Sequence, residues 1–450
     1  MRRHVPDWVT DAVFYQIFPD RFRRGSGEGW SANPQGPSDR SPCGGDLEGI
    51  RQSIPHLQCL GVNALYLTPI FHAASYHKYD TINYYRVDPS LGDEAALRRL
   101  VSELHARGIR IILDGVFNHC GDRHPFFLDA LDKGPASEYW SWFSVDGDRI
   151  RRGAQANYAC WAGIGQLPEW NLRHPDVQEY LLNVVRFWLR EYAIDGWRLD
   201  TTEYLPPDFV RQIYRASREI SSDAYILGEV MGLGTPWFRH DAVDGVMHYR
   251  LLEFLSLFVA EERWDARTFA TNVMKTWNSY PVDGSLGSYT LLSSHDSPRF
   301  LTRCGADPRK FSLALALQMT FPGAPAIYYG DEIGLEGHDD PDNRRCFPWN
   351  ESDWNQEILT AARSLIALRK GSPTLRRGTL RFLRAEGRTI AYERTLGEDC
   401  WLISLNASHD SDARVRLPEG AWRDAQRRDG TQEREELALP ALSCRILQRI

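Results

Sequence analysis

The stretch Gly196-Trp197-Arg198-Leu199-Asp200 follows an apolar, helix-spaced run over Phe187–Ile194 and is itself short and largely apolar. We expect it to form a buried strand, in which alternation places Arg198 and Asp200 on one face. A buried cation favours the ionised form of a neighbouring acid, and an ionised acid at a strand end can act as a nucleophile. A structural ion pair between Arg198 and Asp200 would explain the same stretch. The residues at the other strand ends must therefore distinguish a catalytic acid from a structural one.

Short apolar runs alternate with helix-spaced segments on both sides of this stretch, as far as about residue 370. The predicted strands are Ala12–Phe18, Ala64–Thr68, Ile109–Leu113, 196–200, Ala224–Gly228, Gly245–Met247, Ser288–Leu292 and Ala326–Tyr328. The predicted helices are Ile50–Leu60, Glu94–Arg107, Val177–Tyr192, Phe209–Ile220 and Arg309–Thr320. This alternation predicts an α/β fold, the (β/α)8 TIM barrel, with its active site at the C-terminal ends of the strands.

The barrel is predicted to carry one insertion and to be followed by a second domain. Residues 119–170 break the strand–helix rhythm after the third strand, which leaves 1–118 and 171–371 for the catalytic barrel. We expect a short inserted domain there. After Ser372-Pro373, short strands between turns predict a C-terminal antiparallel β-sandwich domain over 372–450, with strands at Leu380–Leu383, Thr389–Arg394, Cys400–Leu405, Ala413–Leu417 and Ser443–Gln448.

Composition excludes several classes of partner. The formal net charge of -7 comes without a long run of one sign, so we expect no nucleic-acid partner. No run approaches the roughly 18 apolar residues of a membrane span, so we expect no membrane partner. The eight cysteines are scattered without a C-x-x-C pair, and no apolar segment follows Arg2, Arg3 and His4. The scattered cysteines predict reduced thiols in a cytoplasmic protein. The lack of an apolar segment after the basic residues predicts that there is no signal peptide.

Acids and histidines follow four of the predicted strands. Asp114 and Asn118-His119 follow the third strand, Asp200 the fourth, Glu229 the fifth and His295-Asp296 the seventh. Any one acid could be a helix cap or a surface charge, but a barrel brings all of them to one mouth. Enzymes that cleave glycosidic bonds use a pair of carboxyl groups. The two histidines can donate hydrogen bonds to sugar hydroxyls.

These motifs resemble the conserved regions of the α-amylase family, glycoside hydrolase family 13, in the family's order. They are Asp114-x-x-x-Asn118-His119, Gly196-x-Arg198-x-Asp200, Gly228-Glu229 and His295-Asp296. The resemblance implies that Asp200 is the nucleophile, Glu229 the general acid/base and Asp296 the transition-state stabiliser. It also implies that Arg198 orients Asp200 and that Asp114 is mainly structural.

The flanking sequence is similar to cyclomaltodextrinases, neopullulanases and maltogenic amylases. The matching stretches are Ser75-Tyr-His77-Lys-Tyr79-Asp80-Thr81, Gly323–Asp331 and Asp339–Trp349. By that resemblance, Tyr79 stacks on the reacting sugar and His77 binds its hydroxyls. Asp340 and Arg344 would hold the next sugar on the non-reducing side. Core packing of Tyr79 and a surface salt bridge of Arg344 are the alternative interpretations.

The chain departs from these enzymes at four places. They usually carry an N-terminal β domain that swaps between subunits, whereas Asp7-Trp8-Val9 leads almost directly into the first predicted strand. We therefore expect a monomer or a dimer of another kind. Three further departures shape the leaving-group side: Thr201-Thr202-Glu203-Tyr204 replaces Val-Ala-Asn-Glu, Leu167-Pro168-Glu169-Trp170 replaces Met-Pro-Lys-Leu, and Val230-Met231 replaces Ile-Trp.

No cofactor or metal is expected. Many relatives bind calcium after the first strand, but Arg23–Trp30 offers only Glu28 as a carboxylate. Calcium needs about 6–8 oxygen ligands. Asn118 matches a calcium ligand of some α-amylases, which leaves a second site open.

The expected activity is a retaining α-glucan hydrolase that acts on cyclodextrins, maltooligosaccharides or pullulan. The α-1,4 bond is the main expected linkage and the α-1,6 bond the second. One alternative is a transglycosylase, or a disaccharide-acting α-glucosidase or isomerase, of the same family. A more remote alternative is a non-catalytic carbohydrate-binding protein, although such relatives typically lose catalytic acids, and all three are present here.

Overall fold

Eight parallel strands form the centre of the protein. The computed structural model describes residues 5–27, 30, 40–153, 155–239, 242–426 and 432–450. The strands are β1 (Phe14–Ile17), β2 (Ala64–Leu67), β5 (Arg110–Gly115), β6 (Gly196–Leu199), β7 (Tyr225–Gly228), β8 (Gly245–Val246), β9 (Tyr289–Leu291) and β10 (Ala324–Tyr328). They pair in the order β8-β7-β6-β5-β2-β1-β10-β9. A parallel bridge between Met247 and Tyr289 joins the two ends and closes the barrel, so the predicted TIM barrel is confirmed.

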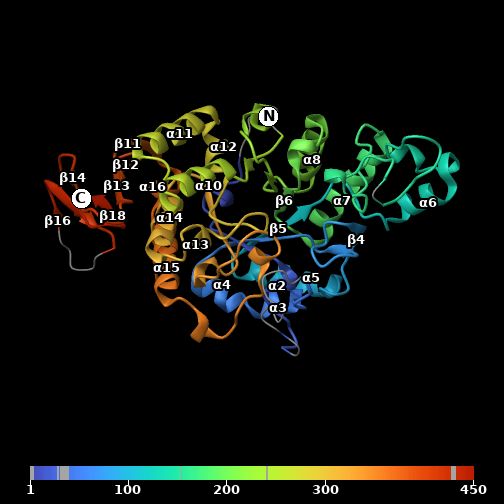
Figure 1. Cartoon of the computed structure of the whole chain (residues 1–450), viewed down its shortest axis with the longest axis horizontal. Helices are drawn as coiled ribbons and strands as arrows, with labels where there is room; N and C mark the ends of the chain where they lie inside the picture. Colours follow the sequence, from blue (N-terminus) through green and yellow to red (C-terminus); the bar gives the residue numbers. More distant parts are fainter. Residues whose placement is uncertain (1–4, 28–29, 31–39, 154, 240–241, 427–431) are drawn as a thin grey trace.

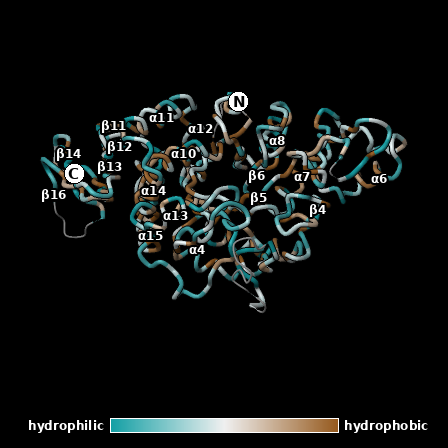
Figure 2. The backbone as a smooth tube through the Cα atoms, viewed as in Figure 1, coloured by the Kyte–Doolittle hydropathy of each residue, from teal (hydrophilic) through white to brown (hydrophobic). Residues whose placement is uncertain are grey.

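Burial explains why these segments are strands. Apart from exposed Arg110, every residue of the eight strands is buried, because helices cover the outer face and side chains fill the interior. Figure 2, in which the backbone is coloured by residue hydropathy, shows hydrophobic residues concentrated in this interior and hydrophilic residues toward the periphery. Within the part of the chain that the structure describes, no helix is both long and apolar enough to span a bilayer.

Helices surround the strands. Four of the longer ones agree closely with the prediction, whereas those over Pro125–Lys133, Ala266–Ser279 and Gln356–Gly371 were not predicted. The longer helices are α5 (Glu94–Ala106), α6 (Pro125–Lys133), α7 (Pro175–Tyr192), α8 (Pro207–Ile220), α11 (Ala266–Ser279), α14 (Pro308–Thr320) and α15 (Gln356–Gly371). The shorter ones are α1 (Asp7–Thr10), α2 (Pro19–Phe22), α3 (Leu47–Gln52), α4 (Ile54–Leu60), α9 (Thr235–Arg239), α10 (Tyr249–Leu255), α12 (Val282–Leu286), α13 (Phe300–Arg303) and α16 (Pro373–Arg377). The single helix predicted over Ile50–Leu60 is wrong. It breaks at Ser53, because Pro55 has no backbone N–H to continue the helix.

Two insertions lie between barrel elements. The antiparallel pair β3 (Phe71–Ala73) and β4 (Thr81–Val87) follows β2 and was not predicted. The segment 119–170 contains α6 and an aromatic cluster, in which Phe126 stacks on Tyr139 with ring centroids 4.1 Å apart. Figure 1 places α6 at the end of the molecule opposite the C-terminal strands.

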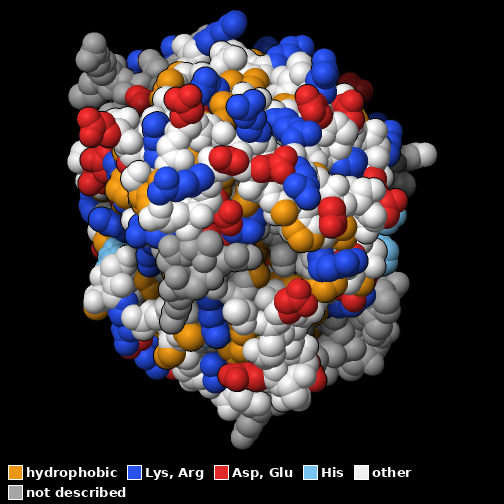
Figure 3. Space-filling model, turned by 90° about the vertical axis from the view of Figure 1, so that its left-hand side faces the viewer, with side chains coloured by type: hydrophobic (Ala, Val, Ile, Leu, Met, Phe, Trp, Pro, Cys, Tyr) orange, Lys and Arg blue, Asp and Glu red, His pale blue; other side chains and the backbone are white. Residues whose placement is uncertain are grey.

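The C-terminal segment forms antiparallel sheets. Its strands are β11 (Thr379–Glu386), β12 (Thr389–Leu396), β13 (Asp399–Asn406), β14 (Ala413–Arg416), β15 (Trp422–Asp424), β16 (Gln432–Glu433), β17 (Glu436–Leu439) and β18 (Ser443–Arg449). Six of them pair as β11-β12-β13-β18-β15-β16, and β14 pairs with β17. A small apolar cluster that includes Leu402, Val415 and Leu437 joins the two sheets. Residues on the other face, such as Tyr392, belong to the main core. Figure 3, which views this end of the molecule, shows basic and acidic side chains intermixed on the surface.

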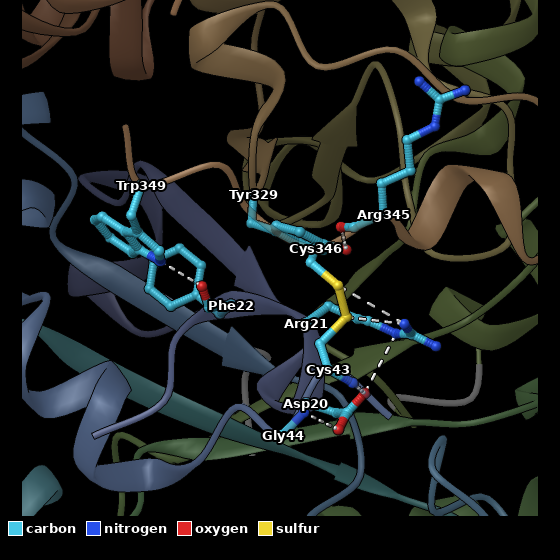
Figure 4. Close-up of a disulfide and its surroundings, with 9 residues drawn as sticks. All are labelled: Asp20, Arg21, Phe22, Cys43, Gly44, Tyr329, Arg345, Cys346 and Trp349. Carbon is cyan, nitrogen blue, oxygen red and sulfur yellow. Dashed lines mark hydrogen bonds and ion pairs between the residues drawn. A yellow bond between two sulfur atoms is a disulfide. The ribbon is translucent and has the colours of Figure 1, made fainter. Parts of the chain in front are cut away.

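A disulfide joins Cys43 to Cys346 across 303 residues of sequence (Figure 4). The expectation of reduced thiols is therefore wrong for this pair. Asp20 accepts hydrogen bonds from the backbone N–H groups of Cys43 and Gly44 and so fixes one side of the bridge. The other six cysteines are free thiols. Spacing could not reveal the pair, because only the closed barrel brings the loops after β1 and β10 together.

Candidate active site

The strand register brings several acids to one end of the barrel. In the β5–β6 pairing, Asp114 lies opposite Arg198. Strands β6 and β7 end at the same level, so the residues that follow them, Asp200 and Glu229, leave the sheet on neighbouring strands. Asp296 lies on the loop after β9. The C-terminal ends of four strands therefore supply one cluster, as the TIM barrel fold requires.

Arg198 is the centre of this cluster and is fully buried. Its Nη1 donates hydrogen bonds to Oδ1 of Asp114 at 2.9 Å and to Oδ1 of Asp200 at 2.7 Å. Its Nη2 lies 2.7 Å from Oε1 of Glu229 and 3.9 Å from Oδ2 of Asp296. One guanidinium thus contacts all four carboxyl groups, which fixes their arrangement beneath the opening.

The cluster has more acids than cations. Besides Arg198, only Arg344 among the described residues forms an arginine ion pair with these carboxylates, through Asp296. Burial raises the pKa of both Asp200 and Glu229, and the charge of Arg198 opposes the rise. A buried group with excess negative charge retains a proton at a higher pH than an isolated acid does. The site can therefore hold one carboxyl group protonated beside ionised ones.

Asp296 is held ionised by its neighbours. Burial would raise its pKa, but His295, Arg198 and Arg344 outweigh burial and hold the pKa well below its usual range. Nε2 of His295 lies 2.9 Å from Oδ2 of Asp296, and Nη2 of Arg344 lies 3.3 Å from Oδ1. The side-chain amide of Gln16 donates to Nδ1 of His295 at 2.7 Å. The ring proton is then on Nε2, which lies 2.5 Å from the Tyr79 hydroxyl as well as 2.9 Å from Asp296.

Asp114 is saturated with hydrogen bonds. Its Oδ2 accepts the hydroxyl of Tyr66 at 2.5 Å and that of Tyr79 at 3.0 Å, in addition to the contacts with Arg198. The Tyr79 ring is parallel to His295, with an interplanar angle of 6° and centroids 5.6 Å apart. Asp114 therefore anchors Arg198 and Tyr79, whose ring remains half-buried at the opening.

Two further histidines near the opening are neutral at neutral pH. Burial lowers the pKa of His77 to about 4 and that of His119 to about 3. Nδ1 of His77 accepts the backbone N–H of Tyr79 at 3.2 Å, which leaves the ring proton on Nε2. Neither ring nitrogen of His119 makes a well-aligned hydrogen bond with the described residues. Both rings can bond to ligand hydroxyl groups.

These side chains line a cavity of about 790 Å³ with two different ends. Charged and polar side chains form one end: Arg40, His77, Asp340 and Arg344. Aromatic and apolar side chains form the other: Trp161, Ile164, Tyr204 and Met231. Tyr204 is 63% exposed and Met231 50% exposed, so this end presents large side chains to the cavity opening.

The disulfide lies behind the polar end. Asp340 pairs with Arg40 and with Arg344, each at 3.1 Å. Cys43 and Cys346 follow Arg40 and Arg344 by only a few residues. The bridge therefore fastens together the two loops that supply this end of the cavity.

The structure brings the predicted site residues together at one opening. Of these, His77, Tyr79, His119, Asp200, Glu229, Asp296, Asp340 and Arg344 line the cavity. Arg198 and His295 lie fully buried beneath it and touch the acids.

Other residues of the site were missed or given no role. Tyr66 and Gln16 contact Asp114 and His295 from β2 and β1. Their positions near the ends of predicted strands were a signal that could have been used. Thr201, Glu203 and Met231 also contact the site, and the sequence marked their segments only as departures from a pattern.

The prediction that the protein needs no calcium rests on the sequence alone. Within the described ranges, no three His, Cys, Asp or Glu side chains are grouped to hold a metal ion. Glu28 lies outside the described residues. Asn118 is buried, and its Nδ2 has no hydrogen-bond partner among the described residues. Independence from metal remains a prediction.

Comparison with known proteins agrees with this geometry. Residues 16–377 match the family model described as alpha amylase, catalytic domain. A cyclomaltodextrinase of Geobacillus thermopakistaniensis (strain MAS1) is 42% identical over 430 residues, which cover 93% of this chain and 73% of the relative. Neopullulanase 2 of Thermoactinomyces vulgaris is 41% identical over 412 residues, which cover 89% and 70%.

A solved structure matches over nearly its whole length. It is the cyclic alpha-maltosyl-(1→6)-maltose hydrolase from Arthrobacter globiformis in complex with cyclic alpha-maltosyl-(1→6)-maltose. The TM-score is 0.91 at 35% sequence identity, and the match covers 99% of each chain.

Proposed function

The chain belongs to the alpha-amylase family and is a glycoside hydrolase of α-glucans, and on that premise we propose that it cleaves short or cyclic α-glucans with retention of configuration. One observation carries the proposal: a single guanidinium, that of Arg198, contacts both Asp200 and Glu229. That bridge keeps the two carboxyl groups close. Retaining enzymes need about 5–5.5 Å between them, against about 6.5–9.5 Å in inverting enzymes.

The reaction then proceeds in two steps. Asp200 attacks the anomeric carbon while Glu229 donates its proton to the glycosidic oxygen, so the leaving sugar departs as a neutral alcohol. A water molecule next attacks the anomeric carbon, Glu229 takes the proton from that water, and Asp200 is released as a carboxylate. Asp296, which is ionised and partly open to the cavity, stabilises the positive charge that develops on the sugar in both transition states.

The contacts of Arg198 support this division of roles. Its Nη1 makes a well-aligned hydrogen bond to Asp200, which favours the ionised form that a nucleophile needs. Nη2 lies close to Glu229 but makes no aligned hydrogen bond with any described residue. On this difference we assign the shared proton to Glu229, although its Oε2 also accepts the backbone N–H of Thr201, a bond that favours ionisation.

Substrate binding is assigned to the side chains around the acids. Tyr79 offers a ring face to the reacting sugar, and the rings of His77 and His119 offer nitrogen atoms to its hydroxyls. His295 lies beneath the cavity and acts on the sugar through Asp296 and Tyr79, which it contacts. Asp340 and Arg344 form the polar end, where they would bind the next sugar toward the non-reducing end. The apolar end, beyond Glu229, would receive the leaving group.

The substrate class rests on the relatives. Two proteins that match most of this chain are named for cyclic compounds: a cyclomaltodextrinase and a cyclic alpha-maltosyl-(1→6)-maltose hydrolase. We infer that cyclic and short linear α-glucans are better substrates than starch. The α-1,6 bonds of pullulan fragments are the second linkage to test. Transglycosylation and disaccharide hydrolysis or isomerisation remain the alternative activities.

One panel of substrates tests the proposal. Products from cyclodextrins, pullulan, soluble starch, maltose, sucrose and trehalose are separated by chromatography, and NMR follows the anomer released first. We expect linear maltooligosaccharides with the α configuration from cyclodextrin. Initial release of the β-anomer would refute retention. Turnover of maltose, sucrose or trehalose alone would show that the enzyme acts on disaccharides instead. No turnover of any substrate would favour a non-catalytic carbohydrate-binding protein.

Two assignments have only the sequence behind them. A monomer or a dimer without domain exchange stays a prediction, to be measured by light scattering. A cytoplasmic location also stays a prediction, and the Cys43–Cys346 disulfide weighs against it, because such bridges are rare in reducing compartments.

A further inference from the structure

The three segments that depart from the resembling enzymes meet at the apolar end of the cavity. The backbone N–H of Trp161 donates to the carbonyl of Leu167 at 2.9 Å. The Trp161 and Tyr204 rings meet edge to face, with centroids 4.6 Å apart. The backbone N–H of Met231 donates to Oε2 of Glu203 at 2.9 Å. Positions far apart in sequence therefore form one wall.

Within this wall, the loops after β6 and β7 are tied to each other twice. The backbone N–H of Thr201 donates to Oε2 of Glu229 at 2.7 Å. In return, the backbone N–H of Met231 donates to Glu203. Each loop thus offers one carboxylate and one N–H two residues apart, and the two hydrogen bonds close a ring that contains Glu229.

The loop that carries Glu203 is rigid. Thr201 has φ 47° and ψ 43°, in the left-handed region that a β-branched residue rarely adopts. Such a conformation costs of order 1–3 kcal/mol and persists only where its surroundings impose it. Thr202 is fully buried and donates its hydroxyl to the carbonyl of Leu199 at 2.8 Å. The strained turn aims the Glu203 side chain across the gap toward β7.

The partner loop has room for that side chain. A β-carbon on Gly232 would lie 3.2 Å from Oε1 of Glu203, closer than nearly all such contacts. The glycine therefore allows the carboxylate to approach the backbone after Glu229.

We propose that Glu203 is a positioning residue: its carboxylate holds the Glu229–Met231 backbone so that the Glu229 carboxyl group stays aimed at the glycosidic oxygen. The inference rests on the proposed function, because it takes Glu229 as the acid. A small misplacement of a reacting group can reduce the rate by up to about 10²-fold. The loss must fall on the steps in which Glu229 moves a proton, namely protonation of the leaving group and deprotonation of the attacking water.

The test uses Glu203→Ala and Glu203→Gln on two substrates. Maltotriose needs a proton on its leaving group, whereas α-maltosyl fluoride needs little protonation. For Glu203→Ala we expect kcat on maltotriose to fall about 10-fold or more, with KM little changed. The first-turnover rate of fluoride release, which precedes the step that uses Glu229 as a base, should be nearly unchanged. Glu203→Gln keeps an oxygen for the Met231 N–H and should restore most of kcat. Glu219→Ala, at an exposed position on α8, is the matched control.

Other results would overturn the inference. Equal losses on both substrates would indicate a general structural role, and an increase in KM alone would indicate direct contact with the sugar. If Glu203→Ala does not fold, Glu203→Asp, whose shorter side chain cannot reach the same N–H, is measured instead. Glu229→Gln is measured in parallel. If that variant lacks the difference between substrates, the proposed function fails; if only the Glu203 variants lack it, this inference fails.

Discussion

Nη1 of Arg198 donates a hydrogen bond of 2.7 Å to Oδ1 of Asp200, and both side chains lie almost entirely out of contact with solvent. The same nitrogen also bonds to Asp114, which is itself held by Tyr66 and Tyr79. The nucleophile is therefore fixed through a chain of buried contacts that reaches across three strands of the barrel.

Replacement of Arg198 should damage both folding and catalysis. A lysine in Arg198→Lys keeps the charge but cannot hold Asp114, Asp200 and Glu229 from two nitrogens. Breaking a buried ion pair typically costs about 3–5 kcal/mol. We expect a lower Tm together with a large decrease in kcat, measured by calorimetry and by maltotriose hydrolysis. Wild-type activity in this variant would mean that the acids do not need the guanidinium.

The two central acids should differ in their dependence on the leaving group. Asp200→Asn should abolish activity on maltotriose and on α-maltosyl fluoride alike, because both need the nucleophile. Glu229→Gln should lose about 10²–10⁴-fold on maltotriose and much less on the fluoride. Product rates on both substrates check this. A reversed pattern would exchange the two assignments.

Stability should fall on acidification below neutral pH. Burial lowers the pKa of His119 and His124 to about 3, and that of His77 and His248 to about 4. In the unfolded chain these groups bind protons near pH 6.5, so the unfolded state gains protons first. The free energy of unfolding should therefore decrease as pH falls from about 6.5 toward 4, by up to about 1.4 kcal/mol per pH unit for each histidine.

A matched variant isolates one contribution to this slope. His124 caps α6, where its Nδ1 accepts the backbone N–H of Phe126. Asn is a good N-cap and does not titrate, so His124→Asn should reduce the slope while retaining the helix. Denaturant unfolding at several pH values measures it. An unchanged slope would mean that His124 is not buried in its neutral form.

The Cys43–Cys346 bridge should stabilise the polar end of the cavity. Removal of a disulfide commonly costs about 2–5 kcal/mol, and this one fastens the loops of Arg40, Asp340 and Arg344. We expect Cys43→Ser to lower Tm and to raise KM more than it lowers kcat. Thiol titration of the unfolded wild type should gain two thiols after reduction. Equal counts with and without reductant would show that the bridge does not form.

Activity should not depend on a divalent metal. The expectation rests on the carboxylate-poor segment 23–30 of the sequence. We predict that exhaustive EDTA treatment leaves both kcat and Tm unchanged, whereas loss of a structural metal would lower them. A decrease that calcium reverses would point to a site near Asn118.

Local patterns in the sequence determined the fold class and the members of the site. Strand and helix periodicity reports burial directly, so the eight strands and four of the longer helices, α5, α7, α8 and α14, could be located from sequence. Asp200, Glu229 and Asp296 stood out because each follows a strand, and parallel strands in a barrel deliver such residues to one end.

Only the tertiary structure decided which distant residues touch. The pairing of β5 with β6 places Asp114 opposite Arg198. The pairing of β1 with β10, the first and last strands of the barrel, brings together the loops that carry Cys43 and Cys346, whose contact spacing along the chain could not predict. The Glu203–Met231 hydrogen bond depends on a strained turn at Thr201. The physical reason is that periodicity records which face of an element is buried, whereas pairing depends on the path of the whole chain.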